Sequence, residues 1–201
     1  AASYDLYGLD RKKPFNAHVV RADISKYKQV AGAFRRFSPL DVIIHLAGEP
    51  LPWAEWEAVL KANIIGTRNV YEAARSVGVR RIIFASSNHV TGAYEGTGYD
   101  DQLDMQCEPQ MISTRDPIRP DSDYGVSKAF GEALARHYFD CWGIHSICLR
   151  IGCVIPDDNP AKDTRNRKFW VSHADLVQLV EKCLSSDVGF GIFYGAVSYT
   201  H

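Results

Sequence analysis

Two patterns of apolar residues alternate along this chain, and their order predicts an α/β fold. Uninterrupted apolar runs at 41–47 and 80–86 are typical of parallel strands that are covered on both faces. Apolar residues at helical spacing mark helices over about 26–37, 53–77, 122–141 and 172–184. Strands and helices in this order favour a doubly wound, mainly parallel sheet with helices on both faces.

The other predicted elements are shorter or carry local detail. Short strands are predicted over residues 4–10, 17–21, 144–150 and 190–194. Asp23 and Ser25 compete as the N-cap of the first helix. The buried stripe of the long helix is predicted to consist of Trp56, Leu60, Ile64, Thr67, Tyr71 and Ala74. Gly66 indicates a close contact of that helix with the sheet.

One stretch has no apolar period. Residues 93–120 contain glycines, prolines and charges, which predicts a loop longer than most connections. We expect part of it to be an insertion at the mouth of a site. Two roles remain open, a lid over a substrate and an ordinary surface loop.

Composition narrows the class of protein. The 201 residues, 46% of them hydrophobic, suffice for one globular domain with a real core. The net charge of −1 gives no reason to expect nucleic acid or an anionic membrane as a partner, and no apolar run is long enough to span a bilayer. The five cysteines include no C-x-x-C pair, which favours reduced, mostly buried thiols in the cytoplasm and no metal site.

The candidate chemistry begins at the helix predicted over 122–141. Tyr124 and Lys128 are four residues apart, so they lie on one helix face, one turn from each other. An ammonium group near a phenol favours the phenolate and lowers the pKa of the tyrosine, which could then take a proton from an alcohol. The alternative is an ordinary amphipathic helix.

The surrounding residues support the chemical interpretation. The strand at 80–86 leads into Ser86 and Ser87, and residues 121–123 (Asp-Ser-Asp) offer N-caps for the helix that carries Tyr124. A hydroxyl at the end of a strand and a tyrosine–lysine pair on the next helix resemble the extended branch of the short-chain dehydrogenase/reductase superfamily. Residues 41–48 and 63–67 (Asn-Ile-Ile-Gly-Thr) carry the same resemblance, which covers about residues 4 to 195.

The resemblance implies a Rossmann-like fold and hydride transfer between a sugar and a nicotinamide cofactor. Tyr124 would take the hydroxyl proton, while Lys128 would lower its pKa and hold the cofactor ribose. Ser87 would donate to the oxygen that becomes a carbonyl. Asn63 would organise water near Lys128, although its amide could equally tie its helix to a neighbouring strand.

The cofactor expected from the resemblance is NAD rather than NADP. Asp10, after the first predicted strand, would bind the adenosine ribose hydroxyls, or it is a simple turn residue. Asp23 and Ile24 would lie along the adenine, which is compatible with a capping role for Asp23. The remaining residues assigned to the cofactor are Leu46, Ala47, Gly48 and Ile151, together with Asn63, Tyr124 and Lys128.

A glycine-rich phosphate loop is absent from its usual place. Such a G-x-G-x-x-G loop lies about 20 residues before the ribose-binding acid, and only nine residues precede Asp10. The glycine pairs at 96–98 and 189–191 do not open a helix. We therefore expect the chain to lack the first strand, loop and helix of its family, and to end before the last elements of its relatives. A catalytically silent fragment or a non-catalytic binding module is one interpretation of this.

The substrate assignment rests on the residues after Ser87. Nucleotide-sugar dehydratases have an Asp-Glu pair there, whereas Asn88 and His89 look like the uronate dehydrogenases, in which these two residues contact the sugar acid. Cys153 would line the substrate side, and Arg165 would bind a carboxylate in a bidentate manner or is a solvated loop charge. The alternative reaction is nucleotide-sugar epimerisation.

Two further expectations concern partners and the core. By resemblance, a homodimer would form through the helices at 53–77 and 122–141. His45, in the central strand, is predicted to be a hydrogen-bonded core histidine and not a ligand.

Overall fold

The computed structural model describes residues 4–12, 18–95, 111–159 and 169–195, and it confirms the predicted α/β class. Its α-helices are α1 (Tyr27–Phe37), α2 (Trp56–Val59), α3 (Thr67–Ser76), α4 (Asp123–Trp142) and α6 (His173–Ser185). A π-helical segment, η1, spans Leu60–Gly66, and two 3₁₀ segments, η2 and η3, span Asn88–Val90 and Gly92–Glu95. The strands are β1 (Gly8–Asp10), β2 (Val19–Arg21), β3 (Val42–His45), β4 (Arg81–Ser87), β5 (His145–Ile151) and β6 (Phe190–Gly195).

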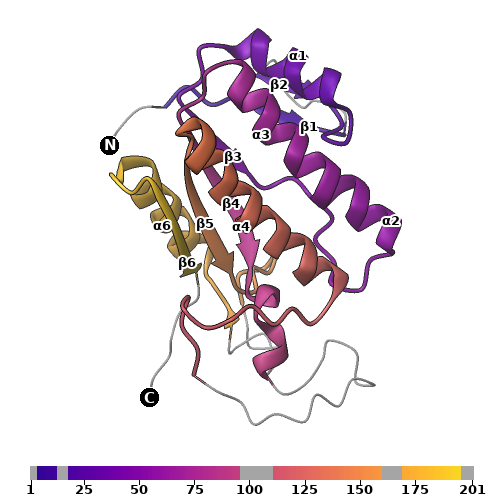
Figure 1. Cartoon of the computed structure of the whole chain (residues 1–201), viewed down its shortest axis with the longest axis vertical. Helices are drawn as coiled ribbons and strands as arrows, with labels where there is room; N and C mark the ends of the chain where they lie inside the picture. Colours follow the sequence, from indigo (N-terminus) through magenta and orange to yellow (C-terminus); the bar gives the residue numbers. More distant parts are fainter. Residues whose placement is uncertain (1–3, 13–17, 96–110, 160–168, 196–201) are drawn as a thin grey trace.

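All pairs of strands are parallel, but they form two sheets where the sequence predicted one. The larger sheet has the order β3-β4-β5-β6, and β1 pairs only with β2 (Figure 1). The register of the larger sheet places Ser87 beside Ile151 at the carboxyl ends of β4 and β5. The predicted parallel pairing is confirmed, and within the described residues it is divided between two sheets because no described strand joins β1 to β3.

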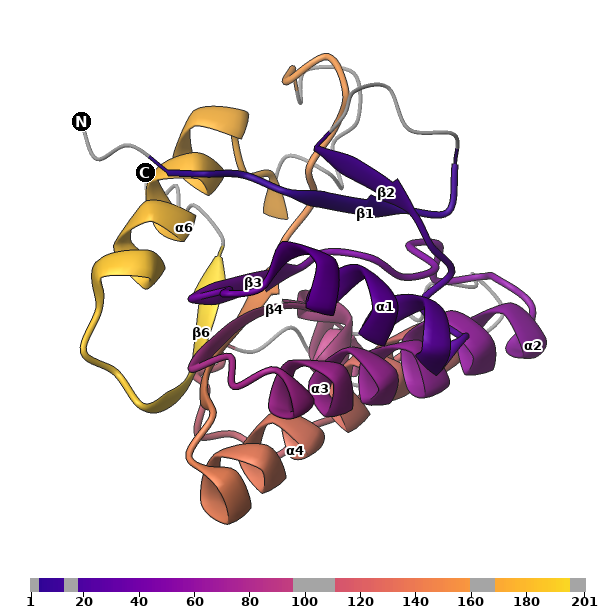
Figure 2. The ribbon, with the colours of Figure 1, turned by 90° about the horizontal axis from the view of Figure 1, so that it is seen from above.

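Helices cover both faces of the larger sheet, as predicted. Side chains alternate across β4, so that Ile82 and Phe84 belong to the core under α1, α3 and α4, whereas Ile83 packs towards α6. Figure 2 shows α6 on the opposite side of the sheet from these three helices. No helix within the described ranges combines the length and the apolar character that crossing a bilayer needs.

The long helix predicted over 53–77 begins at Trp56, and its middle part is the π-helical segment η1. The predicted stripe is buried at Thr67, Tyr71 and Ala74 and half-buried at Leu60 and Ile64. Trp56, which is 44% exposed, departs from the prediction, and Asn63 and Gly66 of η1 are buried as well. Gly66 does contact its surroundings closely, but the contact is with Ile24 and not with the sheet. A Cβ on Gly66 would lie 2.6 Å from Cδ1 of Ile24.

The start of α1 also differs from the prediction. Its N-cap is Lys26, without a side-chain cap, and neither Asp23 nor Ser25 fills that role. Oδ1 of Asp23 instead accepts hydrogen bonds from the backbone N and the Oγ of Ser25. Local turns of this type compete with capping for the same carboxylate.

His45 is a core histidine, as the sequence predicted. Its Nε2 lies 3.1 Å from Oγ1 of Thr67 on α3. Burial lowers the pKa of His45 to about 3, and the charge of Lys128 adds to the effect. The imidazole is therefore neutral at physiological pH and ties β3 to α3.

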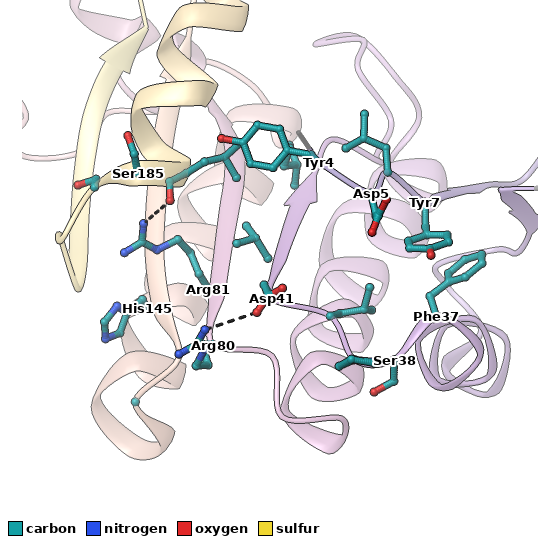
Figure 3. Close-up of a pocket in the computed structure, with 18 of the residues that line it drawn as sticks. Tyr4, Asp5, Tyr7, Phe37, Ser38, Asp41, Arg80, Arg81, His145 and Ser185 are labelled. Atoms are coloured by element: carbon teal, nitrogen blue, oxygen red, sulfur yellow. Dashed lines mark hydrogen bonds and ion pairs between the residues drawn. The ribbon is translucent and has the colours of Figure 1, made fainter. Parts of the chain in front are cut away.

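A cavity of about 1090 Å³ opens at the amino-terminal ends of the strands, where β3, β4 and β5 begin (Figure 3). None of the residues assigned to a site from the sequence lines it. Its cations are largely engaged: Arg81 donates to the carbonyl of Cys183 at 2.7 Å, and Arg80 pairs with Asp41 at 3.4 Å. Because this cavity lies at the amino-terminal ends of the strands, it is separate from the carboxyl ends, where Ser87 lies.

A buried ion pair joins α4 to the centre of the sheet. Arg150 of β5 donates from Nε and Nη2 to the two carboxylate oxygens of Glu132, each at 2.9 Å. Oγ of Ser86 donates to the same carboxylate at 2.6 Å, and Nη1 of Arg150 reaches the hydroxyl of Tyr194 at 3.2 Å. Both charges are almost fully buried, so each depends on the other for compensation.

We predict that Glu132→Ala lowers the free energy of unfolding by about 3–5 kcal/mol, because Arg150 would remain buried without a counter-charge. Urea denaturation at pH 7 measures this change. The double variant Glu132→Leu/Arg150→Met should recover most of the loss, since it removes both charges.

The matched control is Asp140→Ala, which removes the exposed Arg136–Asp140 pair from the same helix. Its expected cost is about 1 kcal/mol or less. If Glu132→Ala costs no more than this control, the buried pair does not have the proposed structural role.

Candidate active site

The site is assembled where the carboxyl end of β4 meets the amino-terminal end of α4. The N-cap of α4 is Ser122, whose Oγ accepts from the backbone N of Gly125 at 3.1 Å. A Cβ on Gly125 would lie 2.4 Å from the backbone oxygen of His89, so glycine permits the close contact of α4 with η2. This contact places Tyr124 next to Ser87.

Tyr124 and Ser87 lie together, as the sequence predicted. Both are buried, and Ser87 lies close enough to the Tyr124 phenol to affect its pKa. Burial raises the pKa of Tyr124 above its usual value; the hydroxyl of Ser87 opposes this rise, and the charge of Asp121 adds to it. The prediction that Lys128 lowers the pKa of Tyr124 is therefore wrong: the pKa is raised, and Lys128 is not among the causes of the shift.

Lys128 binds the strand and not the phenol oxygen. Its Nζ donates to the backbone oxygen of Ala85 in β4 at 2.8 Å and lies 5.4 Å from the centre of the Tyr124 ring. Burial lowers the pKa of Lys128 to about 8. The ring of Phe84 lies 5.3 Å from the same ammonium and offers it a cation–π contact.

The amide of Asn63 is fully used in holding three segments together. Its Oδ1 accepts from the backbone N of Glu49 at 2.7 Å, and its Nδ2 donates to the backbone oxygen of Glu49 and to Oγ of Ser127. Of the two roles open from the sequence, the structure shows the tie, which joins η1 to the turn after β3 and to α4. A Cβ on Gly48 would lie 2.8 Å from Oδ1 of Asn63, so this turn needs a glycine.

Four of the residues assigned to a cofactor line one cavity of about 490 Å³ between β1 and β3: Asp10, Ile24, Leu46 and Ala47. Leu46 is 65% exposed beyond the carboxyl end of β3, which leaves an apolar surface open to a planar ligand. Asp10 also accepts from the backbone N of Lys12 at 2.7 Å. Chemically, this surface and this carboxylate fit an adenine and a ribose.

Asp23 and Ile151 are also assigned to the cofactor but do not line this cavity, and Ile24 has a second role in the core. Asp23 lies outside this cavity and is engaged by Ser25, a hydrogen bond that lowers the pKa of Asp23. The side chain of Ile24 is buried against Gly66, which makes it part of the core as well as the cavity wall. Ile151 ends β5, beside Ser87.

The substrate assignments are partly brought together. Oγ of Ser87 donates to Oδ1 of Asn88 at 3.3 Å, and Nδ1 of His89 lies 2.7 Å from Oδ2 of Asp121. Cys153 is half-buried, and its backbone bridges to the segment at Phe169–Trp170. Arg165 and residues 96–110 of the predicted loop lie outside the described residues, whereas residues 92–95 form η3 and not a loop.

Asp121 is the site residue that sequence reasoning missed. The sequence suggested it only as one of three capping candidates, and Ser122 is the cap. Nothing in the local sequence links Asp121 to His89, which lies 32 residues away. Within the described part of the chain, no cluster of three potential metal ligands occurs.

This chain is similar to known proteins over most of its length. The family model for the NAD dependent epimerase/dehydratase family matches residues 1–178. The chain belongs to this family. The NAD-dependent glucose-6-phosphate dehydrogenase of Haloferax volcanii is 39% identical over 180 residues, a match that covers 90% of this chain and 68% of that protein. The uronate dehydrogenase of Pseudomonas putida is 44% identical over 158 residues, with 78% of this chain and 53% of that protein covered.

Solved structures of family members share the fold. The uronate dehydrogenase of Agrobacterium tumefaciens superimposes with a TM-score of 0.78 at 34% identity, covering 94% of this chain and 66% of that one. The glucuronic acid dehydrogenase of Chromohalobacter salexigens gives a TM-score of 0.77 at 35% identity, covering 96% and 67%. The chain thus spans roughly half to two thirds of the length of these relatives. The Rossmann-like class predicted from the sequence is confirmed.

The buried ammonium of Lys128 leads to a prediction about stability and pH. Its pKa is about 8 in the folded protein, against 10.5 for an unperturbed lysine. Between these values the unfolded chain binds more protons, so the folded state gains stability as the pH rises. Compared with Lys128→Met, the wild-type chain should gain up to about 3 kcal/mol between pH 8 and pH 10 in urea denaturation.

Lys182→Met provides the control, because Lys182 is exposed on α6. Its stability should run parallel to that of the wild type across the same pH range. If Lys128→Met also runs parallel to the wild type, then the ammonium of Lys128 is not destabilised by burial.

Proposed function

We propose that this site carries out hydride transfer from a hydroxyl-bearing carbon of a sugar acid to NAD. The observation that supports it most directly is the placement of Ser87, at the end of β4, beside the buried phenol of Tyr124, with Lys128 one helical turn further on. In an alcohol oxidation, the carbon loses a hydride and the oxygen loses a proton. NAD supplies the hydride acceptor when it is bound.

The residues of the chain account for the proton and for the developing carbonyl. Tyr124 in its phenolate form takes the proton from the substrate hydroxyl, at the distance of a hydrogen bond. Ser87 donates to the same oxygen and fixes its position. Lys128 contributes a positive charge close to the ring of Tyr124 and within reach of a cofactor ribose.

The substrate class follows from residues around the end of β4 and from the relatives. Asn88 and His89 follow Ser87 directly, in the arrangement expected of uronate dehydrogenases, and relatives with that name are 40–44% identical to this chain. Other relatives are named as dehydrogenases of glucose-6-phosphate and of L-arabinose. We assign Arg165 and Cys153 to recognition of the sugar acid, with Arg165 binding its carboxylate.

The cofactor proposed is NAD, held by Asp10, Asp23 and Ile24 at the adenosine end. Leu46, Ala47, Gly48 and Ile151 would lie along its middle. Asp10 favours NAD over NADP because a carboxylate binds ribose hydroxyls and repels a 2′-phosphate. The curated relatives include an NAD-dependent enzyme, and one neighbouring structure of a uronate dehydrogenase mutant contains NAD.

Two features of the wider molecule are also proposed. Exposed apolar side chains on α2 and α4, such as Trp56 and Val126, suit a homodimer formed through these helices.

Free thiols at Cys141, Cys148, Cys153 and Cys183 suit a reducing cytoplasm, although the exposure of Cys141 departs from the buried state expected. The solved epimerases are 23–24% identical to the chain, so they support the fold and no second function.

The first prediction concerns the affinity for NAD. Within the residues that the structure describes, no G-x-G-x-x-G turn opens a helix, and such a turn is the usual source of the N–H groups that bind a pyrophosphate. We expect binding of NAD to these 201 residues to be weak, with a Kd above the micromolar range. Titration of NAD against tryptophan fluorescence measures this, and a Kd of a few micromolar would contradict it.

The second prediction tests the base. The test uses a hybrid protein. It consists of this chain and the segments of the Pseudomonas putida uronate dehydrogenase that lie before and after the region similar to this chain. The hybrid should form NADH from a hexuronate, and Tyr124→Phe should lower kcat roughly 10²–10⁴-fold, as expected for a lost acid–base group. Absorbance of NADH gives the rate, and its net accumulation separates oxidation from epimerisation.

The control is Tyr27→Phe, which alters an exposed tyrosine on α1 and should leave the rate unchanged. Cooperative thermal unfolding establishes that each hybrid is folded. A folded hybrid that is as inactive as its Tyr124→Phe variant would refute the proposed function.

A further inference from the structure

The carboxylate of Asp121 is buried directly ahead of α4, and its side chain is 1% exposed. Its Oδ2 lies 2.7 Å from Nδ1 of His89, and its Oδ1 accepts from Oγ of Ser122 at 2.9 Å. An ionised carboxylate can only accept hydrogen bonds. The Nδ1 atom of His89 therefore carries the hydrogen of this contact.

Two glycines leave room for this carboxylate. A Cβ on Gly92 would lie 2.0 Å from Oδ2 of Asp121, and one on Gly125 would lie 3.3 Å from Oδ1. Gly92 begins η3 and Gly125 belongs to the first turn of α4. Segments before and after the predicted loop thus both accommodate the same charged group.

The backbone fixes Asp121 against the segment that carries His89. The N of Arg119 donates to the oxygen of Val90 at 3.0 Å, and the N of Ala93 donates to the oxygen of Arg119, also at 3.0 Å. These bonds place the residues before α4 beside η2 and η3. The contact between Asp121 and His89 is therefore part of a rigid junction.

Capping of α4 does not explain the buried carboxylate. Ser122 provides the side-chain oxygen for the N-cap, and Asp123 provides an exposed acid in the first turn. Burying a carboxylate is costly unless it is paired and hydrogen-bonded. Besides the hydroxyl of Ser122, the carboxylate of Asp121 has His89 as a partner, and the ring of His89 makes an edge contact with Tyr124 at 5.6 Å between centroids.

We propose that Asp121 is a positioning residue of this site, which holds His89 by Nδ1 and thereby sets the ring of His89 against Tyr124. Its catalytic consequence rests on the proposed function. The arrangement itself rests only on the contacts above.

The carboxylate also acts on Tyr124 electrostatically. Its negative charge contributes to the raised pKa of Tyr124, after the larger effect of burial and against the opposite effect of the Ser87 hydroxyl. The titratable groups that face Tyr124 are His89 from η2, Asp121 ahead of α4 and Lys128 one turn along α4. Removing only the charge of Asp121 should therefore lower the pKa of Tyr124.

The test uses the 201-residue chain and NMR, so it needs no enzymatic activity. Nitrogen-15 spectra of the histidine side chains report which ring nitrogen carries hydrogen, and His89→Gln identifies the signals of His89. We expect Nδ1 of His89 to be protonated in the wild type and in Asp121→Asn, whose side-chain oxygen still accepts. In Asp121→Ala, the signals should shift towards the Nε2–H tautomer.

The second measurement follows the ionisation of Tyr124 in chain labelled with carbon-13 at tyrosine Cζ, with Tyr124→Phe for assignment. Asp121→Asn should move the titration of Tyr124 to lower pH by on the order of one unit. Asp123→Asn is the matched control. It changes an exposed acid two residues after Asp121, in the first turn of α4, and should change neither signal.

The outcomes separate the alternatives. If both Asp121 variants give the same His89 tautomer and Tyr124 titration as Asp123→Asn, Asp121 is structural only and the proposal is wrong. In the active hybrid, Asp121→Asn should shift the acid limb of the kcat profile to lower pH. An inactive hybrid with the expected NMR changes would refute the proposed reaction and leave the positioning role of Asp121 supported.

Discussion

The carboxylate of Glu132 holds together the three elements that carry the candidate site. It lies on α4, one turn beyond Lys128, and binds Arg150 of β5 and Ser86 of β4 at once. Ser86 precedes Ser87, and Arg150 precedes Ile151, so a single buried group fixes the ends of both strands relative to the helix. In a low-dielectric interior this contact is strong only if every partner is present. The position of Tyr124 over the strand ends therefore depends on a charge that lies outside the reacting centre.

Two further buried charged groups, Lys128 and Asp121, lie around Tyr124, and they affect how the site titrates rather than how the elements are held together. Lys128 and Asp121 flank Tyr124, the ammonium next to its ring and the carboxylate behind His89. Burial lowers the pKa of Lys128 and raises that of Tyr124, so both groups resist their charged forms. Such groups are costly in a folded protein and cluster where chemistry occurs. The spacing of Tyr124 and Lys128 thus brings the groups together, while their surroundings decide how each one titrates.

The two halves of the site differ in how completely these residues build them. The reacting half, around β4 and α4, consists of buried and half-buried side chains, and His89, Asp121 and Lys128 each have a hydrogen-bond contact within it, to one another or to the backbone of β4. The cofactor half, between β1 and β3, is an open cavity with an exposed Leu46. The relatives that share this fold are longer than the chain, which covers 66% of the uronate dehydrogenase of Agrobacterium tumefaciens. This contrast is the reason for testing affinity for the cofactor separately from the chemistry of Tyr124.

The sequence alone determined the features that depend on neighbours along the chain. Apolar periods gave the order of strands and helices, and the spacing of four residues placed Tyr124 and Lys128 on one face of α4. Parallel strands with their carboxyl ends at one edge then brought Ser87 to Tyr124. The tertiary structure decided what depends on contacts between distant segments. It separated β1–β2 from the main sheet, placed the π-helical segment η1 within the long helix, directed Lys128 to Ala85 and paired Asp121 with His89. These outcomes could not be predicted because hydrogen bonds and desolvation depend on which atoms come into contact in the folded protein. His89 and Asp121 are 32 residues apart, so no local sequence pattern indicates their contact.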